Sequence, residues 1–303
     1  MSHYTPIEDL PMVYIEGLIE LLEISKGYVV GGSSQSDEID DLIFGSETSQ
    51  GVVATLNKGK SSGTGINSAL KGYLLGGYST VVLREIESFR FPSETTTLLS
   101  ETLGPYSRAG GGVNNLTNGW QLGTTGSNEE EIVRFVFSTE VATTLVEVLP
   151  DTRNYGAAVS KTDKGYVIGG ITVDGTTIVG FLFSTEVAAD ITATLTNSIA
   201  YSPGCNSTTK GYSMGGGATP VNIIESLTFS GETTSVLSST LDTAKASGTG
   251  TNSGAKGYHM GGTVSPVSDV IEDLIFNGET SQTITATLET ARSTGAGVQS
   301  GYL

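Results

Sequence analysis

A seven-residue string, KGYVVGG at 26–32, is repeated along the whole chain. Its copies are KGYLLGG at 71–77, NGWQLGT at 118–124, KGYVIGG at 164–170, KGYSMGG at 210–216 and KGYHMGG at 256–262. The glycine at its second position recurs in steps of 44 to 47 residues, at 27, 72, 119, 165, 211, 257 and 301. Self-similarity at a fixed period of this length indicates units that stack on one another. We therefore expect a single repeat domain over 26–303.

One unit, 211–257, reads as four short strands. GYSMGG is an apolar run that ends in a Gly-Gly turn, and residues 223–233 alternate between two faces as a strand does. The SGET turn leads to a third strand at 235–241, and the Gly- and Thr-rich stretch 246–255 supplies a fourth. Because no helical periodicity interrupts this pattern, the unit is predicted to be a four-stranded antiparallel blade of a β-propeller.

Three positions keep their residue type in all six units. Large aromatic side chains at two of them are expected to fill the space between neighbouring blades. A glutamate at the third suggests a role in the turn itself, as an acceptor for nearby backbone N–H groups, because a catalytic acid would be expected once and not six times. The members are Phe44, Phe91, Phe137, Phe183, Phe229 and Phe276; Tyr28, Tyr73, Trp120, Tyr166, Tyr212 and Tyr258; and Glu47, Glu94, Glu140, Glu186, Glu232 and Glu279.

The unit resembles the kelch-type β-propeller repeat. ARSTGAGVQSGYL at 291–303 and RAGGGVNNLTNGWQLG at 108–123 show that family's order, a basic residue and a Gly-rich inner strand before an aromatic-apolar strand. The late Trp of the family's outermost strand is replaced by Leu56, Leu103, Leu149, Leu195, Leu241 and Leu288. The resemblance implies an all-β fold, a kelch-like propeller of four-stranded antiparallel blades.

The resemblance also implies how the ring closes. The first unit begins with the second strand of its blade at Lys26, so the stretch 293–300 can return as the innermost strand of that blade. Seven blades are the alternative, because IEDL at 7–10 echoes IEDL at 271–274. The first IEDL is followed by a shorter spacing without a Gly-rich strand, which favours six blades.

Residues 1–25 lie outside the repeat and are predicted to form an N-terminal arm. An amphipathic helix or an edge strand would suit its apolar residues Val13, Leu18, Leu21, Leu22 and Ile24. Two roles stay open for this arm. It would either pack against the propeller or attach the chain to a partner, including further copies of itself in a homo-oligomer.

Alternate connections of antiparallel strands lie on opposite faces of a propeller. The turns between strands one and two and between strands three and four are uniform, whereas the other loops differ, as in 33–40, 78–85 and 124–131. Binding residues concentrate on loops that a rigid scaffold holds. The variable face is therefore the predicted binding face.

Two kinds of side chain on that face are candidate ligand contacts. Basic residues stand near the start of the inner strand and would surround the channel mouth; they are Lys60, Arg108, Arg153, Lys245 and Arg292. These cations would either capture an anionic group or pair with acids at the start of strand three, namely Asp40, Glu87, Glu225 and Glu272. Loop tyrosines suit contacts with a glycan or a protein. They are Tyr78, Tyr106, Tyr155 and Tyr201, and Arg84 shares the loop of Tyr78.

The chain lacks the residues that common catalytic centres need. His3, His259 and the single Cys205 cannot assemble the copper ligands of a kelch-fold oxidase, nor do they complete a nucleophile with its base. No CxxC, P-loop or HExxH pattern occurs. We expect no enzyme activity, cofactor or metal. The acidic stretches 37–41 and 129–131 lack the spacing of a calcium loop and are expected to be solvated.

Charge and hydropathy restrict the partners. The formal net charge is −17, with 15 basic residues, which argues against nucleic-acid and anionic-membrane binding. No apolar run approaches the length of a membrane-spanning helix. The first residues, MSHYTPIEDLPMVY, do not have the pattern of a secretory signal peptide.

The wording KGYxxGG…FSxET is similar to repeats of tail-associated proteins of tailed bacteriophages. That resemblance implies a virion structural protein, placed on the virion or outside the cell. It would contact a host surface glycan or receptor, or other virion proteins, through the variable face. A cytoplasmic kelch-type protein–protein interaction module is the alternative, and a propeller glycan hydrolase is a second one.

Overall fold

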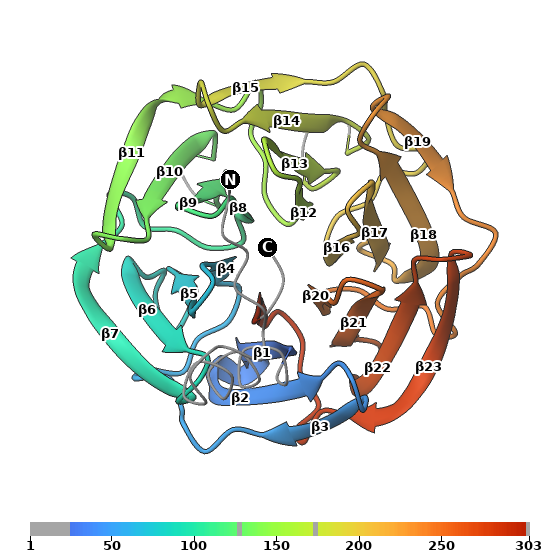
Figure 1. Cartoon of the computed structure of the whole chain (residues 1–303), viewed down its shortest axis with the longest axis horizontal. Helices are drawn as coiled ribbons and strands as arrows, with labels where there is room; N and C mark the ends of the chain where they lie inside the picture. Colours follow the sequence, from blue (N-terminus) through green and yellow to red (C-terminus); the bar gives the residue numbers. More distant parts are fainter. Residues whose placement is uncertain (1–24, 126–128, 172–174, 301–303) are drawn as a thin grey trace, which may run out of the picture.

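The computed structural model describes residues 25–125, 129–171 and 175–300, and this part of the chain is an all-β propeller of six blades (Figure 1). Each blade is a four-stranded antiparallel sheet with its innermost strand beside the central axis and its outermost strand at the rim. The predicted fold class is confirmed, and the seven-bladed alternative is wrong. The predicted arm at 1–25 lies, apart from Ser25, outside the described residues.

The six sheets follow the repeat along the chain. From the axis outward, the first three blades are β24 (Ala296–Gln299), β1 (Lys26–Gly32), β2 (Ser36–Ile43) and β3 (Thr48–Gly51); β4 (Thr64–Asn67), β5 (Lys71–Leu75), β6 (Glu85–Arg90) and β7 (Thr95–Thr102); and β8 (Gly111–Asn114), β9 (Asn118–Leu122), β10 (Glu131–Val136) and β11 (Val141–Val148). The last three are β12 (Ala157–Ser160), β13 (Lys164–Ile168), β14 (Ile178–Leu182) and β15 (Val187–Asp190); β16 (Gly204–Asn206), β17 (Lys210–Gly216), β18 (Val221–Thr228) and β19 (Thr233–Val236); and β20 (Thr249–Asn252), β21 (Lys256–Thr263), β22 (Val267–Ile275) and β23 (Thr280–Thr287). A 3-10 helix, η2 (Ser33–Gln35), connects β1 and β2.

The C-terminal strand closes the ring, as predicted. β24 pairs antiparallel with β1, with Val298 opposite Tyr28. Beyond the strand, the backbone N–H of Lys26 donates to Ser300 Oγ at 3.0 Å. Blade 1 is thus assembled from both ends of the described chain.

The outermost strand of blade 5 is shorter than predicted. The sequence places it at 235–241, but β19 ends at Val236. Leu241 lies beyond the strand and is buried, and its backbone N–H donates to the carbonyl of Asn222 at 2.9 Å. The repeated leucine therefore covers the edge of its own blade from the connection to the next one.

Aromatic rings fill the spaces between blades, as predicted. The ring of Tyr73 in blade 2 stacks on Phe137 of blade 3, with centroids 5.6 Å apart and an angle of 9° between the rings. Four equivalent stacks join other neighbouring blades, and the sixth interface, between blades 6 and 1, is closed by Tyr258 on Phe44. Each buried apolar cluster accordingly spans two adjacent blades.

Glycine allows the inner strands to approach one another around the axis. A Cβ on Gly112 would lie 2.0 Å from the carbonyl oxygen of Gly65, and a Cβ on Gly65 would lie 2.1 Å from that of Gly297. A real side chain cannot occupy that space, so these positions require glycine. Glycine fills the equivalent position in five inner strands, and Ala158 fills it in the sixth.

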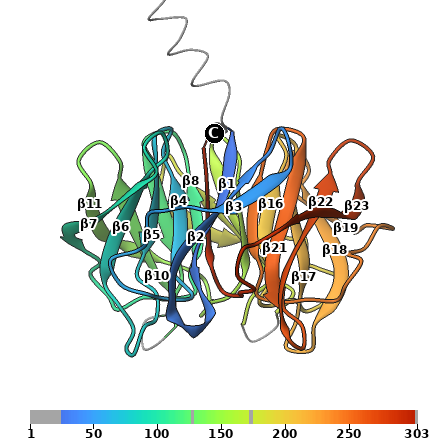
Figure 2. The same ribbon diagram turned by 90° about the horizontal axis from the view of Figure 1, so that it is seen from below.

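The propeller has two faces that we name by their connections (Figure 2). The turn face, at the top of Figure 2, carries the turns between the first and second strands and between the third and fourth strands of each blade. The loop face, at the bottom, carries the connections between the second and third strands and from one blade to the next.

Candidate functional site

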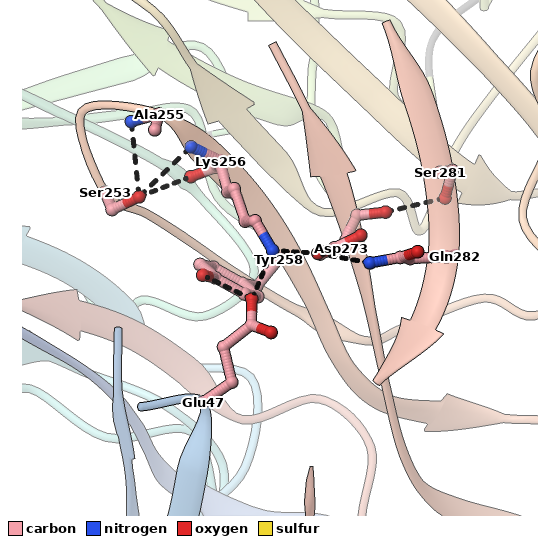
Figure 3. A network of polar contacts seen from close by, with 8 residues as sticks. All are labelled: Glu47, Ser253, Ala255, Lys256, Tyr258, Asp273, Ser281 and Gln282. Atoms are coloured by element: carbon pink, nitrogen blue, oxygen red, sulfur yellow. Dashed lines mark hydrogen bonds and ion pairs between the residues drawn. The ribbon is translucent and has the colours of Figure 1, made fainter. Parts of the chain in front are cut away.

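A polar clamp joins neighbouring blades at the turn face (Figure 3). Glu47 of blade 1 accepts hydrogen bonds from Lys256 Nζ at 2.6 Å and from the Tyr258 hydroxyl at 3.2 Å, both in blade 6. Lys256 Nζ also lies 2.7 Å from Asp273 on the adjacent strand of its own blade. The carboxylate therefore links two sheets.

Every blade repeats this clamp with the next one. Lys26 and Tyr28 donate to Glu94, and in blade 3, where the lysine is absent, Trp120 Nε1 and Arg134 bind Glu186 instead. The remaining clamps are Lys71–Tyr73–Glu140, Lys164–Tyr166–Glu232 and Lys210–Tyr212–Glu279. The prediction that these glutamates serve their own turn must be corrected, because the carboxylate acts between blades.

The hydrogen bonds of the clamp shift the pKa values of Lys26 and Glu232 in the directions that favour their charged forms. Burial alone would lower the pKa of Lys26, but its hydrogen bonds to Asp41 and Glu94 raise it above the ordinary value. Burial would likewise raise the pKa of Glu232, yet the hydrogen bonds from Lys164 and Tyr166 lower it. Burial and the nearby carboxylate raise the pKa of Tyr258. In the five clamps that contain a tyrosine, the pKa of that tyrosine is raised, so it stays neutral beside the ion pair at neutral pH.

Four of the basic residues predicted to surround the channel mouth lie inside the protein. Lys60, Arg153, Lys245 and Arg292 are at most 2% exposed. Lys60 Nζ lies 3.0 Å from Glu87, Lys245 Nζ lies 3.1 Å from Glu272, and Arg292 lies 2.5 Å from Asp40. The alternative of ion pairing thus describes these three cations, and none of the four is available at the surface to capture a ligand.

At two of the other three interfaces, only one member of such an ion pair is present. Arg153 has no acid on the adjacent β14 and donates instead to the carbonyls of Gly169 and Thr177, with Asp151 at 3.0 Å. Glu225 is fully buried without a cation, because the equivalent position of its interface is Ile199; one carboxylate oxygen accepts the Thr196 N–H and the other has no hydrogen-bond partner among the described residues.

Arg108 does not belong to this register. The second glycine of each Gly-Gly turn donates its backbone N–H to a carbonyl in the connection to the next blade. That carbonyl belongs to Lys60 at one interface and to Ser107 at the next. Ser107 is therefore the structural equivalent of Lys60, and Arg108 lies one residue further on. It is half-buried on the loop face, and its Nε donates to Thr125 Oγ1 at 2.8 Å.

The channel is narrowed at the loop face by a ring of backbone hydrogen bonds. One residue of each blade donates its N–H to the carbonyl of the preceding blade at 2.6–2.8 Å, and all six have positive φ. Tyr155 and Tyr201 are two of them, and their rings lie 4.5 Å apart. The six residues are Ser62, Ala109, Tyr155, Tyr201, Ser247 and Thr294. They line a small cavity of about 110 Å³.

Four of the predicted contact residues form what we call the Tyr–Arg patch: Tyr78, Arg84, Tyr106 and Arg108. The Arg108 guanidinium lies over the Tyr78 ring, 5.0 Å from its centroid, and that of Arg84 lies 5.5 Å from the centroid of Tyr106. Tyr106 is 65% exposed. Both pairs join the loop after β5 to the connection after β7, which are tied together by the Ser107 N–H and the Leu83 carbonyl at 3.0 Å.

A larger cavity of about 570 Å³ occupies the channel and opens at the turn face. Side-chain amides and hydroxyls at the ends of the inner strands line it, and sequence reasoning missed them. The available signal was an amide or hydroxyl residue before each turn into the second strand, at Asn67, Asn114, Ser160, Asn206, Asn252 and Gln299. That signal was read as part of a uniform scaffold turn.

Among the described residues, the thiol of Cys205 and the imidazole of His259 are buried. Burial raises the pKa of the Cys205 thiol and, with the nearby charge of Lys245, lowers the pKa of His259 well below its ordinary value. In the stretch 37–41, which was expected to be solvated, Asp40 and Asp41 are buried and pair with Arg292 and Lys26. Within 25–125, 129–171 and 175–300, no group of three or more His, Cys, Asp or Glu residues could hold a metal ion.

Neither a scan against protein-family models nor a search among curated proteins finds a match to this chain. In the part of the chain that the structure describes, no helix has the length and apolar character needed to cross a membrane. The fold is consistent with a binding or protein-interaction module, in which a rigid scaffold presents loops and a central channel.

Proposed function

We propose that this chain is a non-enzymatic binding protein that holds an anionic surface glycan on its loop face. The observation that carries the proposal is the Tyr–Arg patch. Its two guanidinium groups lie over tyrosine rings, and neither forms an ion pair with a carboxylate of the described residues. In a chain of net charge −17, such unpaired cations mark a place for an anionic partner.

The hydrogen bonds of the patch leave its charges available. Arg84 Nε donates to the Leu103 carbonyl at 2.7 Å and Arg108 Nε donates to Thr125, so each guanidinium is held by Nε. The terminal nitrogens remain for a carboxylate or sulfate, which guanidinium binds with two parallel hydrogen bonds. The tyrosine rings offer rigid surfaces against which a sugar ring can pack.

The resemblance of the repeat to tail-associated proteins of tailed bacteriophages supports a setting for this binding. In that setting the protein belongs to the virion and the glycan belongs to the host surface. A cytoplasmic kelch-type interaction module is the alternative that the same patch would serve, because tyrosine and arginine also dominate protein–protein hot spots. The burial of Cys205 and His259 supports binding without catalysis, and we expect no release of reducing sugar from any bound glycan.

The test measures binding of the full chain to immobilised oligosaccharides by biolayer interferometry. A sulfated heparin hexasaccharide and a carboxylated oligogalacturonate serve as anionic probes, and cellohexaose as a neutral one. We expect binding to an anionic probe that weakens with added salt and falls at least tenfold in Arg84→Ala/Arg108→Ala. Tyr106→Ala should weaken binding less.

Arg90→Ala is the matched control, because Arg90 is exposed on the same blade and likewise forms no ion pair with a described residue. Thermal unfolding of each variant shows that the fold is intact. Equal binding by Arg84→Ala/Arg108→Ala and Arg90→Ala would overturn the proposal. Co-purification of the protein with intact phage particles tests the setting separately.

A further inference from the structure

The wide cavity at the turn face is ringed by side-chain amides whose orientation is fixed. The side-chain oxygen at the end of one inner strand accepts the backbone N–H of the equivalent residue in the preceding blade. Asn114 Oδ1 accepts from Asn67 at 3.3 Å, Gln299 Oε1 accepts from Asn252 at 2.8 Å, and Asn67 Oδ1 accepts from Gln299 at 2.9 Å. Two further links, Asn114 to Ser160 and Asn206 to Asn252, extend the ring.

This arrangement occupies the side-chain oxygens of Asn67, Asn114, Asn252 and Gln299, whereas Asn206 uses its Nδ2 to donate to the Ser207 carbonyl at 3.3 Å. Asn252 is 5% exposed, and its Nδ2 has no hydrogen-bond partner among the described residues. A buried amide donor without a partner costs free energy unless something accepts its hydrogen bond. Asn252 lines the cavity, but its Nδ2 has almost no accessible surface, so the amides that can donate into the cavity are those of the less buried Asn67 and Asn114.

The cavity wall is neutral, in contrast to the whole protein. Among the described residues that line it there is no aspartate or glutamate, and the single cation, Lys161, pairs with Asp163 at 2.9 Å. The rest of the wall is mostly glycine, serine, threonine and asparagine, with the 72% exposed Leu116 at the rim; Ala158, Val159, Pro203, Ala296 and Gln299 complete it. Its volume of about 570 Å³ lies within the usual range of small-molecule sites, about 300–1,000 Å³.

We propose that this cavity is a second binding site, which takes the end of a neutral, hydroxyl-rich oligosaccharide along the propeller axis. Hydroxyl and ring oxygens would accept hydrogen bonds from the amide nitrogens of Asn67 and Asn114. A charged sugar has no counterion in the wall and would be disfavoured by desolvation. The site lies on the face opposite the Tyr–Arg patch and does not depend on it.

The test titrates neutral trisaccharides into the full chain and follows backbone amide signals by NMR. Maltotriose, cellotriose and N,N′,N″-triacetylchitotriose are the probes, and sialyllactose is the charged comparison. We expect at least one neutral probe to shift the amide signals of Gly65, Gly112 and Gly250, with sialyllactose at least tenfold weaker. This readout locates the ligand without any substitution.

The double variant Asn67→Asp/Asn114→Asp removes two side-chain amide donors and keeps the hydrogen bonds between inner strands that form the amide ring. Each aspartate retains the oxygen that accepts the neighbouring N–H, but it replaces an amide donor by a negative acceptor. We expect at least a tenfold loss of affinity. Asn57→Asp/Asn277→Asp is the control, because both residues are exposed, lie outside the cavity and add the same charge.

Two results would overturn the inference. One is that no neutral probe shifts the glycine signals at millimolar concentration. The other is that the probes bind Asn67→Asp/Asn114→Asp as tightly as the control variant. Arg84→Ala/Arg108→Ala should bind the neutral probes unchanged, so failure at one site is distinguishable from failure at the other.

Discussion

The two faces of the propeller hold neighbouring blades together in different ways. At the turn face, one half-exposed clamp recurs at every interface, such as Lys256 with Glu47. Beneath the loop face, the contacts are fully buried and differ from one interface to the next. Lys245 faces Glu272, whereas Ile199 faces Glu225.

The width of the channel mouth does not follow the variability of the loops around it. The face with variable loops has the narrow mouth, closed by six backbone hydrogen bonds, and the face with uniform turns has the cavity of about 570 Å³. Repetition on the turn face is therefore compatible with a site. Six equivalent residues that would be scattered on a surface converge here on one axis and form a single ring.

The largest expected effect comes from the glycines at which the inner strands approach one another around the axis. Gly112→Val places a side chain against the Gly65 carbonyl, which the inner strands cannot accommodate. We expect the free energy of unfolding to fall by about 3 kcal/mol or more, measured by urea denaturation with the fluorescence of the buried Trp120. Gly45→Ala is the control, because nothing lies within 4 Å of its added Cβ. A loss below about 1 kcal/mol in Gly112→Val would contradict the packing described for the axis.

Removing a buried charge beneath the loop face should change the free energy of unfolding in opposite directions at two interfaces. Glu272→Gln leaves Lys245 buried without its carboxylate, and we expect a loss of about 3 kcal/mol in the free energy of unfolding. Glu225→Gln removes a buried charge that has no cation, and we expect a gain of about 1 kcal/mol. The same denaturation series measures both. Equal signs for the two substitutions would show that the interfaces are balanced alike.

The amide ring at the wide mouth should contribute less. Asn67→Leu removes the acceptor of the Gln299 N–H and so weakens the contact between β4 and the closing strand β24. We expect a loss of about 1 kcal/mol. Asn67→Asp retains that acceptor and should lose clearly less. If both variants lose the same amount, the hydrogen bond is not what the asparagine contributes.

The clamps at the turn face should make the stability of the protein depend on pH in the acidic range. The folded-state pKa of Glu232 is lowered from its ordinary value of 4.5, so its contribution is present above that pH and is lost as the pH falls through the folded-state pKa. We expect Glu232→Gln to flatten the fall in melting temperature between about pH 5 and about pH 3. The effect is the smallest of the four because the pair is partly solvated. Unchanged slopes in the variant would remove Glu232 from the acid response.

Most of the fold could be predicted from the repeat. The strand alternation and the aromatic positions follow from patterns that are local or periodic, and the return of 293–300 to the first blade was implied by the resemblance to the kelch-type repeat. The extent of β19 could not be predicted, because Leu241 continues the apolar pattern of the strand after its pairing has ended. The register of Arg108 was missed because a basic residue directly follows the structurally equivalent Ser107.

The candidate sites were less accessible to sequence reasoning. Glu47 and Lys256 are 209 residues apart, so the local turn was the nearest explanation for the glutamate. The Tyr–Arg patch lay among the predicted residues, but its pairing of Arg108 with Tyr78 depends on two segments that the sequence does not place together. The amide ring could not be predicted, because the same type of residue recurs in every unit and a periodic pattern does not tell which positions face the axis.

The place of β24 in blade 1 affects how the protein is made. Synthesis delivers β1, β2 and β3 first, and Ser300, which Lys26 contacts, follows 274 residues later. Until the ribosome has released nearly the whole chain, Phe44 has no Tyr258 to stack on. The first sheet of the propeller to be synthesised is therefore the last to be completed, and the ring of Phe44 stays without its stacking partner until then.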